Sequence, residues 1–156
     1  RIKGVVLKVG CETSPAVYQG LREAIQAFRA SGKRAVAYAE QFDPQPFHLD
    51  EDVANSSVLG GLAASGWHTS SILMRMICDA LFLKLEAIGS SSIEEMKWLK
   101  PVYAGEVLSG TLTITDKRRS NSKPNTGIIN FDATLNNAAG EQKAFMRSMV
   151  FVRLQP

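Results

Sequence analysis

The segment WHTSSILMRMICDALFLKLE, residues 67–86, decides the fold because it is the longest apolar stretch of the chain. Its apolar side chains occupy nearly the full circumference of a helix, so we predict a helix that is covered on most sides. Arg75, Asp79 and Lys84 interrupt the segment, which excludes a membrane span. Arg75 and Asp79 have the four-residue spacing of an ordinary helical ion pair.

The sequence after this helix has the two-residue period of β-strands. Polar and apolar residues alternate from residue 93 onward, and turn-forming residues lie at 120–125 and 136–140. Four strands are therefore predicted, at 93–99, 107–119, 128–136 and 143–154. Strands that follow one another through such short turns form an antiparallel sheet.

A single apolar helix followed by long antiparallel strands indicates an α+β fold. Because no other element is apolar enough to cover the helix, we predict a curved sheet that wraps around a long central helix, the hotdog arrangement. A sheet with free edge strands commonly pairs with a second copy of itself. We therefore expect a homodimer or a dimer of dimers.

The length and composition of the chain are those of one soluble domain. A chain of 156 residues with 45% apolar and 21% charged residues suits a single domain over 1–156 and excludes a disordered chain. Residues 1–35 form an atypical N-terminal segment. Within it a short strand is predicted at 5–9, and Ser14 and Pro15 are expected to begin a helix that ends near Ala30.

The charge and cysteine content exclude several classes of function. A net charge of +3 leaves no basic stripe for nucleic acid, although it would not repel an anionic ligand. Cys11 and Cys78 are isolated, so we expect no metal site and a reducing cytoplasm. The chain opens at Arg1 with no signal peptide in view, and no association with a membrane is expected.

A proline-braced segment, FDPQPFHLD at residues 42–50, carries the candidate chemistry. Each proline pushes the residue before it toward extended geometry, so Asp43 and Gln45 are kept out of the helical region. Asp43 and His48 are thereby held on a stiff loop as a potential general acid/base pair. The alternative is a turn followed by a helix that Asp50 caps, with His48 as a surface or hydrogen-bonded core histidine.

Three segments together resemble the MaoC-like dehydratase family, which includes the (R)-specific enoyl-CoA hydratases of the hotdog fold. The family motif Asp-x-Asn-Pro-x-His-x-Asp is matched in spacing by Asp43, Gln45, Pro46, His48 and Asp50. The segments GGLAASGWHT at 60–69 and WLKPVYAGE at 98–106 resemble the family's glycine loop and its entry into the long strands. The resemblance covers about residues 36–154, with Gln45 in place of the motif's Asn and Ser65 where many hydratases have His.

The resemblance implies the roles of the candidate site residues. Asp43 and His48 would hold and activate water and move its proton, and the backbone N–H of Gly66 would stabilise the enolate oxygen. Gln45, Ser65 and Trp67 would contribute to substrate binding. The alternative for Gly66 is a glycine that relieves crowding at the start of a helix, and for His68 we favour a structural role.

A basic cluster at the predicted hairpin end has two interpretations. Its members are Lys117, Arg118, Arg119 and Lys123. They are either a solvated turn or a contact for the phosphates of coenzyme A, which arginine can bind through two hydrogen bonds; we include Arg118 and Arg119 as candidate substrate contacts.

The function that the resemblance implies is a hydro-lyase of fatty acid metabolism. It would reversibly hydrate trans-2-enoyl-CoA thioesters to (R)-3-hydroxyacyl-CoA, with coenzyme A as part of the substrate and no separate cofactor. The alternatives are a hotdog acyl-CoA thioesterase and a non-catalytic acyl-CoA-binding module.

Overall fold

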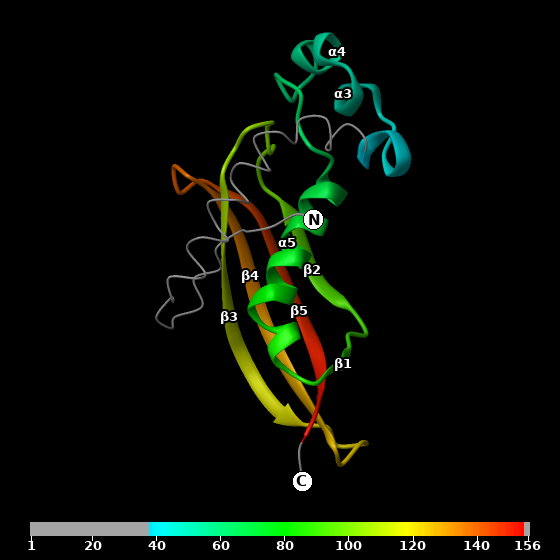
Figure 1. Ribbon diagram of the computed structural model, residues 1–156, viewed down its shortest axis with the longest axis vertical. Coiled ribbons are helices and arrows are strands. Elements are labelled where there is room, and N and C mark those ends of the chain that lie inside the picture. Colours follow the sequence, from blue (N-terminus) through cyan, green and yellow to red (C-terminus); the bar gives the residue numbers. More distant parts are fainter. Residues whose placement is uncertain (1–37, 155–156) are drawn as a thin grey trace.

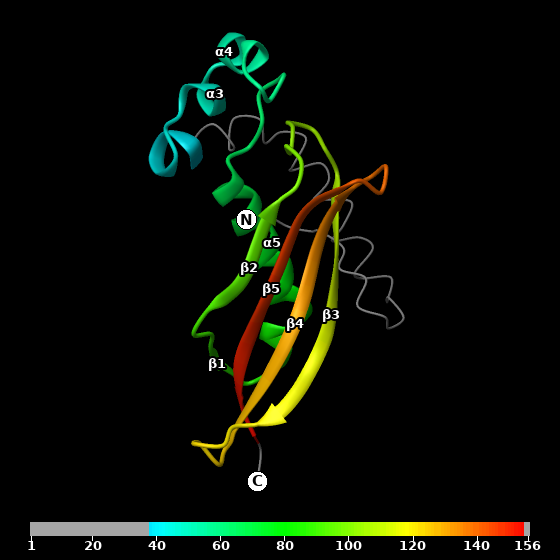
Figure 2. The ribbon, with the colours of Figure 1, turned by 180° about the vertical axis from the view of Figure 1, so that it is seen from behind.

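The structure is a computed structural model that describes residues 38–154. The predicted strand at 5–9, the predicted helix at 14–30 and Cys11 lie outside the described residues. Figure 1 shows a curved sheet wrapped around one long helix, and Figure 2 shows the convex back of that sheet. The α+β hotdog arrangement predicted from the sequence is therefore confirmed.

The sheet is antiparallel and has the strand order β1-β5-β4-β3, with β2 also pairing with β5. Each of the four predicted strands is present with bounds that differ by at most two residues, and the short edge strand β1 was not predicted. The bounds are β1 Ala87–Gly89, β2 Ile93–Trp98, β3 Leu108–Arg119, β4 Thr126–Asn137 and β5 Gln142–Arg153.

The β4–β5 hairpin turn confirms the expectation of turn-forming residues there. Gly140 has φ +80°, a conformation that favours glycine. The side-chain oxygen of Asn137 accepts hydrogen bonds from the N–H groups of Ala139 and Glu141 at 3.1 and 3.0 Å. These bonds close the turn and help to fix the pairing register of β4 and β5.

Helix α5, Gly66–Ala80, packs against the concave face of the sheet. Its buried residues Leu73 and Ile77 are fully covered, and they meet Phe131 of β4 in the same core. The predicted Arg75–Asp79 ion pair is present, with Nη2 of the arginine 2.8 Å from Oδ1 of the aspartate. The central helix is thus a core element.

The predicted end of this helix at residue 86 was wrong. Helix α5 ends at Ala80, and the chain tightens into the 3₁₀ turn η1, Phe82–Lys84, before it enters β1. Pairing of β1 with β5 requires extended backbone at 87–89, so the helix must end before these residues. Apolar periodicity cannot distinguish a helix from a turn that packs Phe82 against Phe131. The prediction that this segment is covered on most sides is also wrong at Leu83, whose side chain is 73% exposed.

Two short helices, α3 Pro46–Leu49 and α4 Glu51–Ser56, lie beyond the end of the sheet near the start of α5. Asp50 caps α4, because its Oδ1 accepts from the N–H of Val53 at 2.9 Å, as predicted. Residues 38–42 are helical. Within residues 38–154, no helix has the length and apolarity needed to cross a bilayer.

Candidate functional site

Asp43 and His48 approach each other at the end of the molecule where α3 leads toward α5. Nε2 of His48 lies 3.7 Å from Oδ2 of Asp43, and the two side chains are 9% and 16% exposed. Gln45 has φ −79° and ψ 135°, the extended geometry that Pro46 imposes on the residue before it. Pro46 therefore acts as the sequence predicts, and the chain brings the acid and the imidazole together.

The orientation of the His48 ring is determined by a backbone acceptor. Nδ1 of His48 lies 3.0 Å from the carbonyl oxygen of Ala63. Because a carbonyl oxygen only accepts, Nδ1 carries a hydrogen, and Nε2 of the neutral ring is then unprotonated. His48 is buried and hydrogen-bonded, so it is no surface histidine, and its second ring nitrogen faces the Asp43 carboxylate.

Two side chains donate to the Asp43 carboxylate. The Ser65 hydroxyl donates to Oδ2 at 2.6 Å, and the Gln45 amide donates to Oδ1 at 2.7 Å. The hydrogen bond from Ser65 and then that from Gln45 lower the pKa of Asp43 below its ordinary value of 3.8, against a smaller opposing effect of burial. Asp43 is therefore a carboxylate at neutral pH and only accepts hydrogen bonds.

With the neutral form of His48, this arrangement leaves two acceptors facing each other. An ionised Asp43 and a neutral His48 have no hydrogen to share across the 3.7 Å between Oδ2 and Nε2. A water molecule has two O–H groups, so one water can donate to both atoms at once. The pair can therefore hold a water and take a proton from it, which is the chemistry of general acid/base catalysis.

Ser65 connects this pair to the central helix. The residue is fully buried and is the N-cap of α5, since its hydroxyl oxygen accepts from the N–H of Trp67 at 3.2 Å. The same hydroxyl donates its hydrogen to Asp43. The sequence placed Ser65 among the substrate contacts, whereas its contacts in the structure are with Asp43 and with the helix that it caps.

Gly66 is the first residue of α5, and the indole of Trp98 lies against it. A Cβ at Gly66 would lie 2.7 and 2.8 Å from ring atoms of Trp98. The indole is held in place, because its Nε1 donates to the Ser70 hydroxyl at 3.0 Å and its ring meets Trp67 edge-on at 5.2 Å. The close approach that requires glycine here is therefore made by Trp98, and the oxyanion role of the Gly66 N–H stays a prediction.

The substitution Gly66→Ala is expected to destabilise the protein by about 1 to 3 kcal/mol, because the new methyl overpacks the Trp98 ring. In a Trp98→Ala background the same substitution should become neutral or stabilising, since alanine is the better helix former. Urea unfolding of the wild type, the two single variants and the double variant gives the cost of Gly66→Ala in each background. An equal cost in the two backgrounds would rule out the indole as the cause.

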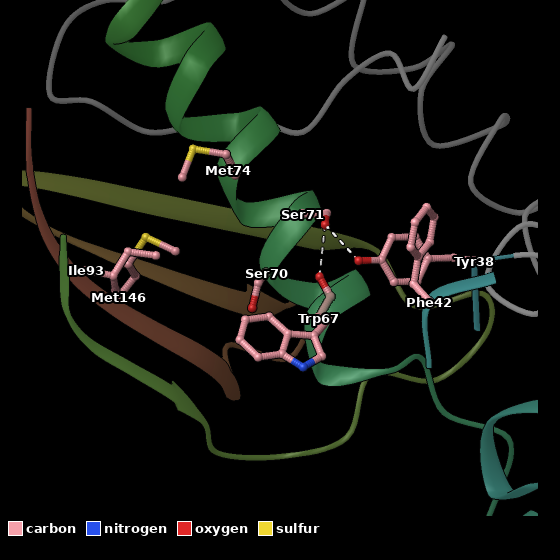
Figure 3. A pocket seen from close by; sticks show the side chains of 8 residues that line it. All are labelled: Tyr38, Phe42, Trp67, Ser70, Ser71, Met74, Ile93 and Met146. Carbon is pink, nitrogen blue, oxygen red and sulfur yellow. Dashed lines mark hydrogen bonds between the residues drawn. The ribbon is translucent and has the colours of Figure 1, made fainter. Parts of the chain in front are cut away.

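A cavity of about 530 Å³ lies along α5, and neither Asp43 nor His48 is among its lining residues. Figure 3 shows that Trp67, Ser70, Ser71 and Met74 of α5 line its centre, with residues of the sheet on one side and of helical segment 38–42 on the other. The remaining lining residues are Ile93, Met146, Tyr38 and Phe42. Phe42 directly precedes Asp43, and the N–H of Trp67 donates to the Ser65 hydroxyl, which in turn donates to Asp43. Two lining residues are therefore direct neighbours of residues that form or hold the pair.

The MaoC like domain matches residues 19–137, which is most of the chain. A solved MaoC-like dehydratase from Rhodospirillum rubrum is 37% identical, with a TM-score of 0.73 over 80% of this chain and 85% of that one. The chain belongs to the MaoC-like family.

Other MaoC-like comparisons are more distant. The R-hydratase PhaJ1 from Pseudomonas aeruginosa has a TM-score of 0.62 at 17% identity and covers 79% of this chain and 75% of its own, which supports the fold alone. A protein of Bacillus subtilis, uncharacterized protein YdeM, is 28% identical over 93 residues. That match spans 60% of this MaoC-like chain and 66% of the relative, just under two thirds of its length.

The structure does not bring every predicted site residue of this MaoC-like chain together. Trp67 lines the cavity, and Gln45 and Ser65 hold Asp43. Arg118 and Arg119 end β3 at the opposite end of the molecule from α3 in both views. A phosphate contact by these arginines beside the pair therefore has no support within one chain.

Two contributors were missed by the sequence reasoning. Ala63 supplies a backbone oxygen to His48, and no side-chain pattern reports such an acceptor. Tyr38 reaches the cavity from outside the motif and stacks on His68 at 4.8 Å. Burial lowers the pKa of His68, and its Nδ1 has no hydrogen-bond partner among the described residues. Nor do the described residues hold a cluster of three metal-ligating side chains.

Proposed function

We propose that this MaoC-like protein is a hydro-lyase that reversibly adds water to trans-2-enoyl-CoA thioesters, with (R)-3-hydroxyacyl-CoA as the product. The observation that carries the proposal is the 3.7 Å separation of Oδ2 of Asp43 from Nε2 of His48, two acceptors suited to one water. Membership of a family with solved members named dehydratases supports the same class of reaction. The R configuration and coenzyme A come from the resemblance.

His48 is the proposed proton carrier. As the water oxygen bonds to C3, Nε2 takes one of its protons, and the electron pair of the C2=C3 bond moves toward the thioester oxygen. Imidazole is better matched to neutral pH than a carboxylate with a lowered pKa, so Asp43 holds the second water hydrogen and stabilises the imidazolium. The imidazolium then returns the proton to C2, which completes the addition of H and OH.

The enolate oxygen is proposed to accept from the N–H of Gly66. The first N–H groups of a helix have no partner within it, and the N-terminus of α5 carries partial positive charge. Loss of a donor of this kind costs about 100 to 1,000-fold in turnover. No separate cofactor is part of the proposal. The proposal also includes that the protein is a homodimer in the cytoplasm.

The cavity is the proposed site of the acyl chain, because its hydroxyl groups already have partners. Ser70 donates to the Gly66 carbonyl and accepts from Trp98, each at 3.0 Å. Ser71 donates to the Trp67 carbonyl at 2.9 Å and also lies 3.4 Å from the Tyr38 hydroxyl, as the dashed lines in Figure 3 mark. The walls therefore favour an unsubstituted apolar chain, and 530 Å³ is within the usual range of ligand pockets.

Met74 is expected to limit the acyl chain length. Filling the cavity with Met74→Trp should lower kcat/KM for a trans-2-octenoyl thioester by about 10-fold or more, while the value for crotonyl-CoA stays within about twofold. The volume-conserving change Met74→Leu is the matched control and should leave the ratio of the two substrates as it is. If Met74→Trp leaves the ratio of the two kcat/KM values unchanged, the acyl chain does not occupy this cavity.

Two spectroscopic assays test the proposal against the thioesterase alternative. A hydratase removes the absorbance of crotonyl-CoA without release of thiol. A thioesterase releases free thiol from a saturated acyl-CoA. With crotonyl-CoA, it lowers the enoyl absorbance only as fast as it hydrolyses the thioester. Tight binding of both thioesters with no turnover would identify a binding module and end the case for an enzyme.

A further inference from the structure

Lys143 of β5 is a buried cation that the proposed mechanism does not use. Its side chain is 3% exposed, and its ammonium contacts three oxygens. These are the carbonyl oxygen of Pro101 at 3.0 Å, Oε1 of Glu106 at 2.9 Å and Oε2 of Glu141 at 2.7 Å. Two of the three belong to the loop at 101–106 that joins β2 to β3, so Lys143 fixes this loop to the sheet.

Glu106 ties the same loop internally. Its Oε2 accepts from the N–H of Tyr103 at 2.9 Å, and its Oε1 accepts from the Asn137 amide at 3.1 Å. Burial would raise the pKa of Glu106, but the hydrogen bonds from Lys143, Tyr103 and Asn137 together lower it. Burial would lower the pKa of Lys143, and its bonds to Glu141 and Glu106 raise it instead. The pair is therefore ionised at neutral pH.

The loop at 101–106 holds the segment at 59–65 that leads into α5. The carbonyl oxygen of Val102 accepts from the N–H of Ala64 at 2.8 Å, and Ala63 forms an antiparallel bridge with Tyr103. The Tyr103 hydroxyl also donates to the carbonyl oxygen of Leu59. Ala63 is the residue whose carbonyl oxygen orients His48. Contacts therefore run without a break from Lys143 to the imidazole.

We infer that Lys143 is a positioning residue for His48, a role that rests on the proposed function for its catalytic consequence. By fixing the loop at 101–106, the ammonium holds the Ala63 carbonyl where Nδ1 of His48 donates to it and Nε2 faces Asp43. A buried ion pair gains little stability over apolar packing of the same volume, because desolvation offsets the attraction. Its directional bonds to three oxygens do fix the loop, and a 1 Å displacement of a catalytic group costs about 100-fold.

The substitution Lys143→Met tests this role, and Lys100→Met is its matched control. Lys100 is 56% exposed and binds Oε1 of the same Glu141 at 2.6 Å, but it does not contact the loop's carbonyl or Glu106. The nitrogen NMR signals of the imidazoles report the tautomer directly, and the chain has only two histidines to assign. In the full chain, we expect His48 to have hydrogen on Nδ1 in the wild type and in Lys100→Met, and a mixture of tautomers in Lys143→Met.

Kinetics supply the second readout. Lys143→Met should lower kcat for crotonyl-CoA about 10 to 100-fold with KM within about twofold, because the water-holding geometry changes and the cavity does not. If Lys143→Met does not fold, Glu106→Gln keeps the shape of the carboxylate and removes its charge, and it should shift the tautomer in the same direction. A folded variant with an unchanged His48 tautomer overturns the inference.

The two readouts separate this inference from the proposed function. A wild-type protein that hydrates nothing, combined with a tautomer shift in Lys143→Met, contradicts the hydratase and supports the positioning role. Hydration by the wild type, combined with no shift in either Lys143→Met or Glu106→Gln, contradicts the positioning role and leaves the hydratase in place.

Discussion

Asp43→Asn and His48→Ala are each expected to lower kcat/KM for hydration of crotonyl-CoA by about 100 to 10,000-fold, the usual contribution of a positioned acid or base. Asparagine at position 43 replaces a carboxylate oxygen, which accepts from the water, with an amide group that donates. Alanine at position 48 removes the proton carrier that faces Oδ2 of Asp43. Because the two groups hold one water, the double variant should be no more than a few-fold worse than the poorer single variant. Loss of enoyl absorbance measures each rate.

The control for these variants is His68→Phe. His68 is the other histidine, and phenylalanine keeps the stacking on Tyr38 while it removes a buried Nδ1 that has no partner among the described residues. This variant should keep hydration within a few-fold of the wild type, and circular dichroism should show all four variants folded. Folded Asp43→Asn and His48→Ala proteins with near-normal turnover would defeat the assignment of the pair.

Ser65→Ala is expected to lower kcat/KM by about 10 to 100-fold, which corresponds to the loss of a hydrogen bond to a charged group. The Ser65 hydroxyl is the largest cause of the lowered pKa of Asp43, so its removal should raise that pKa toward 3.8. A carbon NMR titration of the Asp43 carboxyl, assigned with Asp43→Asn, measures the change. A pKa lowered on folding stabilises the native state above about pH 4, so the variant should also lose less stability on acidification.

Asp50→Ala separates this effect from the loss of a helix cap. Asp50 caps α4 as Ser65 caps α5, and each substitution costs about 1 kcal/mol of capping. Asp50 makes no described contact with Asp43, so Asp50→Ala should leave both the Asp43 titration and kcat/KM near their wild-type values. Equal losses of activity in the two variants would mean that stability, and not the carboxylate, is affected.

The elements with the strongest periodicity were predictable from the sequence. The two-residue alternation in β3, β4 and β5 reflects one face packed on α5, and the structure keeps those strands within two residues of the predicted bounds. The approach of Asp43 to His48 was predictable in part. Pro46 restricts the backbone of Gln45 before any tertiary contact forms, but the segment alone also fitted a capped helix with a structural histidine, and the family resemblance favoured the pair.

The remaining features depend on contacts between distant residues. Ser65 donates to a carboxylate 22 positions away, and Ala63 accepts through its backbone, so neither has a local pattern. The sequence pattern indicates that Lys143 is an ordinary polar strand residue, although its side chain is buried against the loop at 101–106. The end of α5 at Ala80 is determined by pairing of β1 with β5, which periodicity does not report.

The most direct test of the account is the isotopic composition of the product formed from crotonyl-CoA in water labelled with ¹⁸O and deuterium. Mass spectrometry should find one ¹⁸O on C3 and one deuteron on C2 of an intact 3-hydroxyacyl thioester. Recovery of ¹⁸O only in a free carboxylic acid, with the double bond retained, would contradict it.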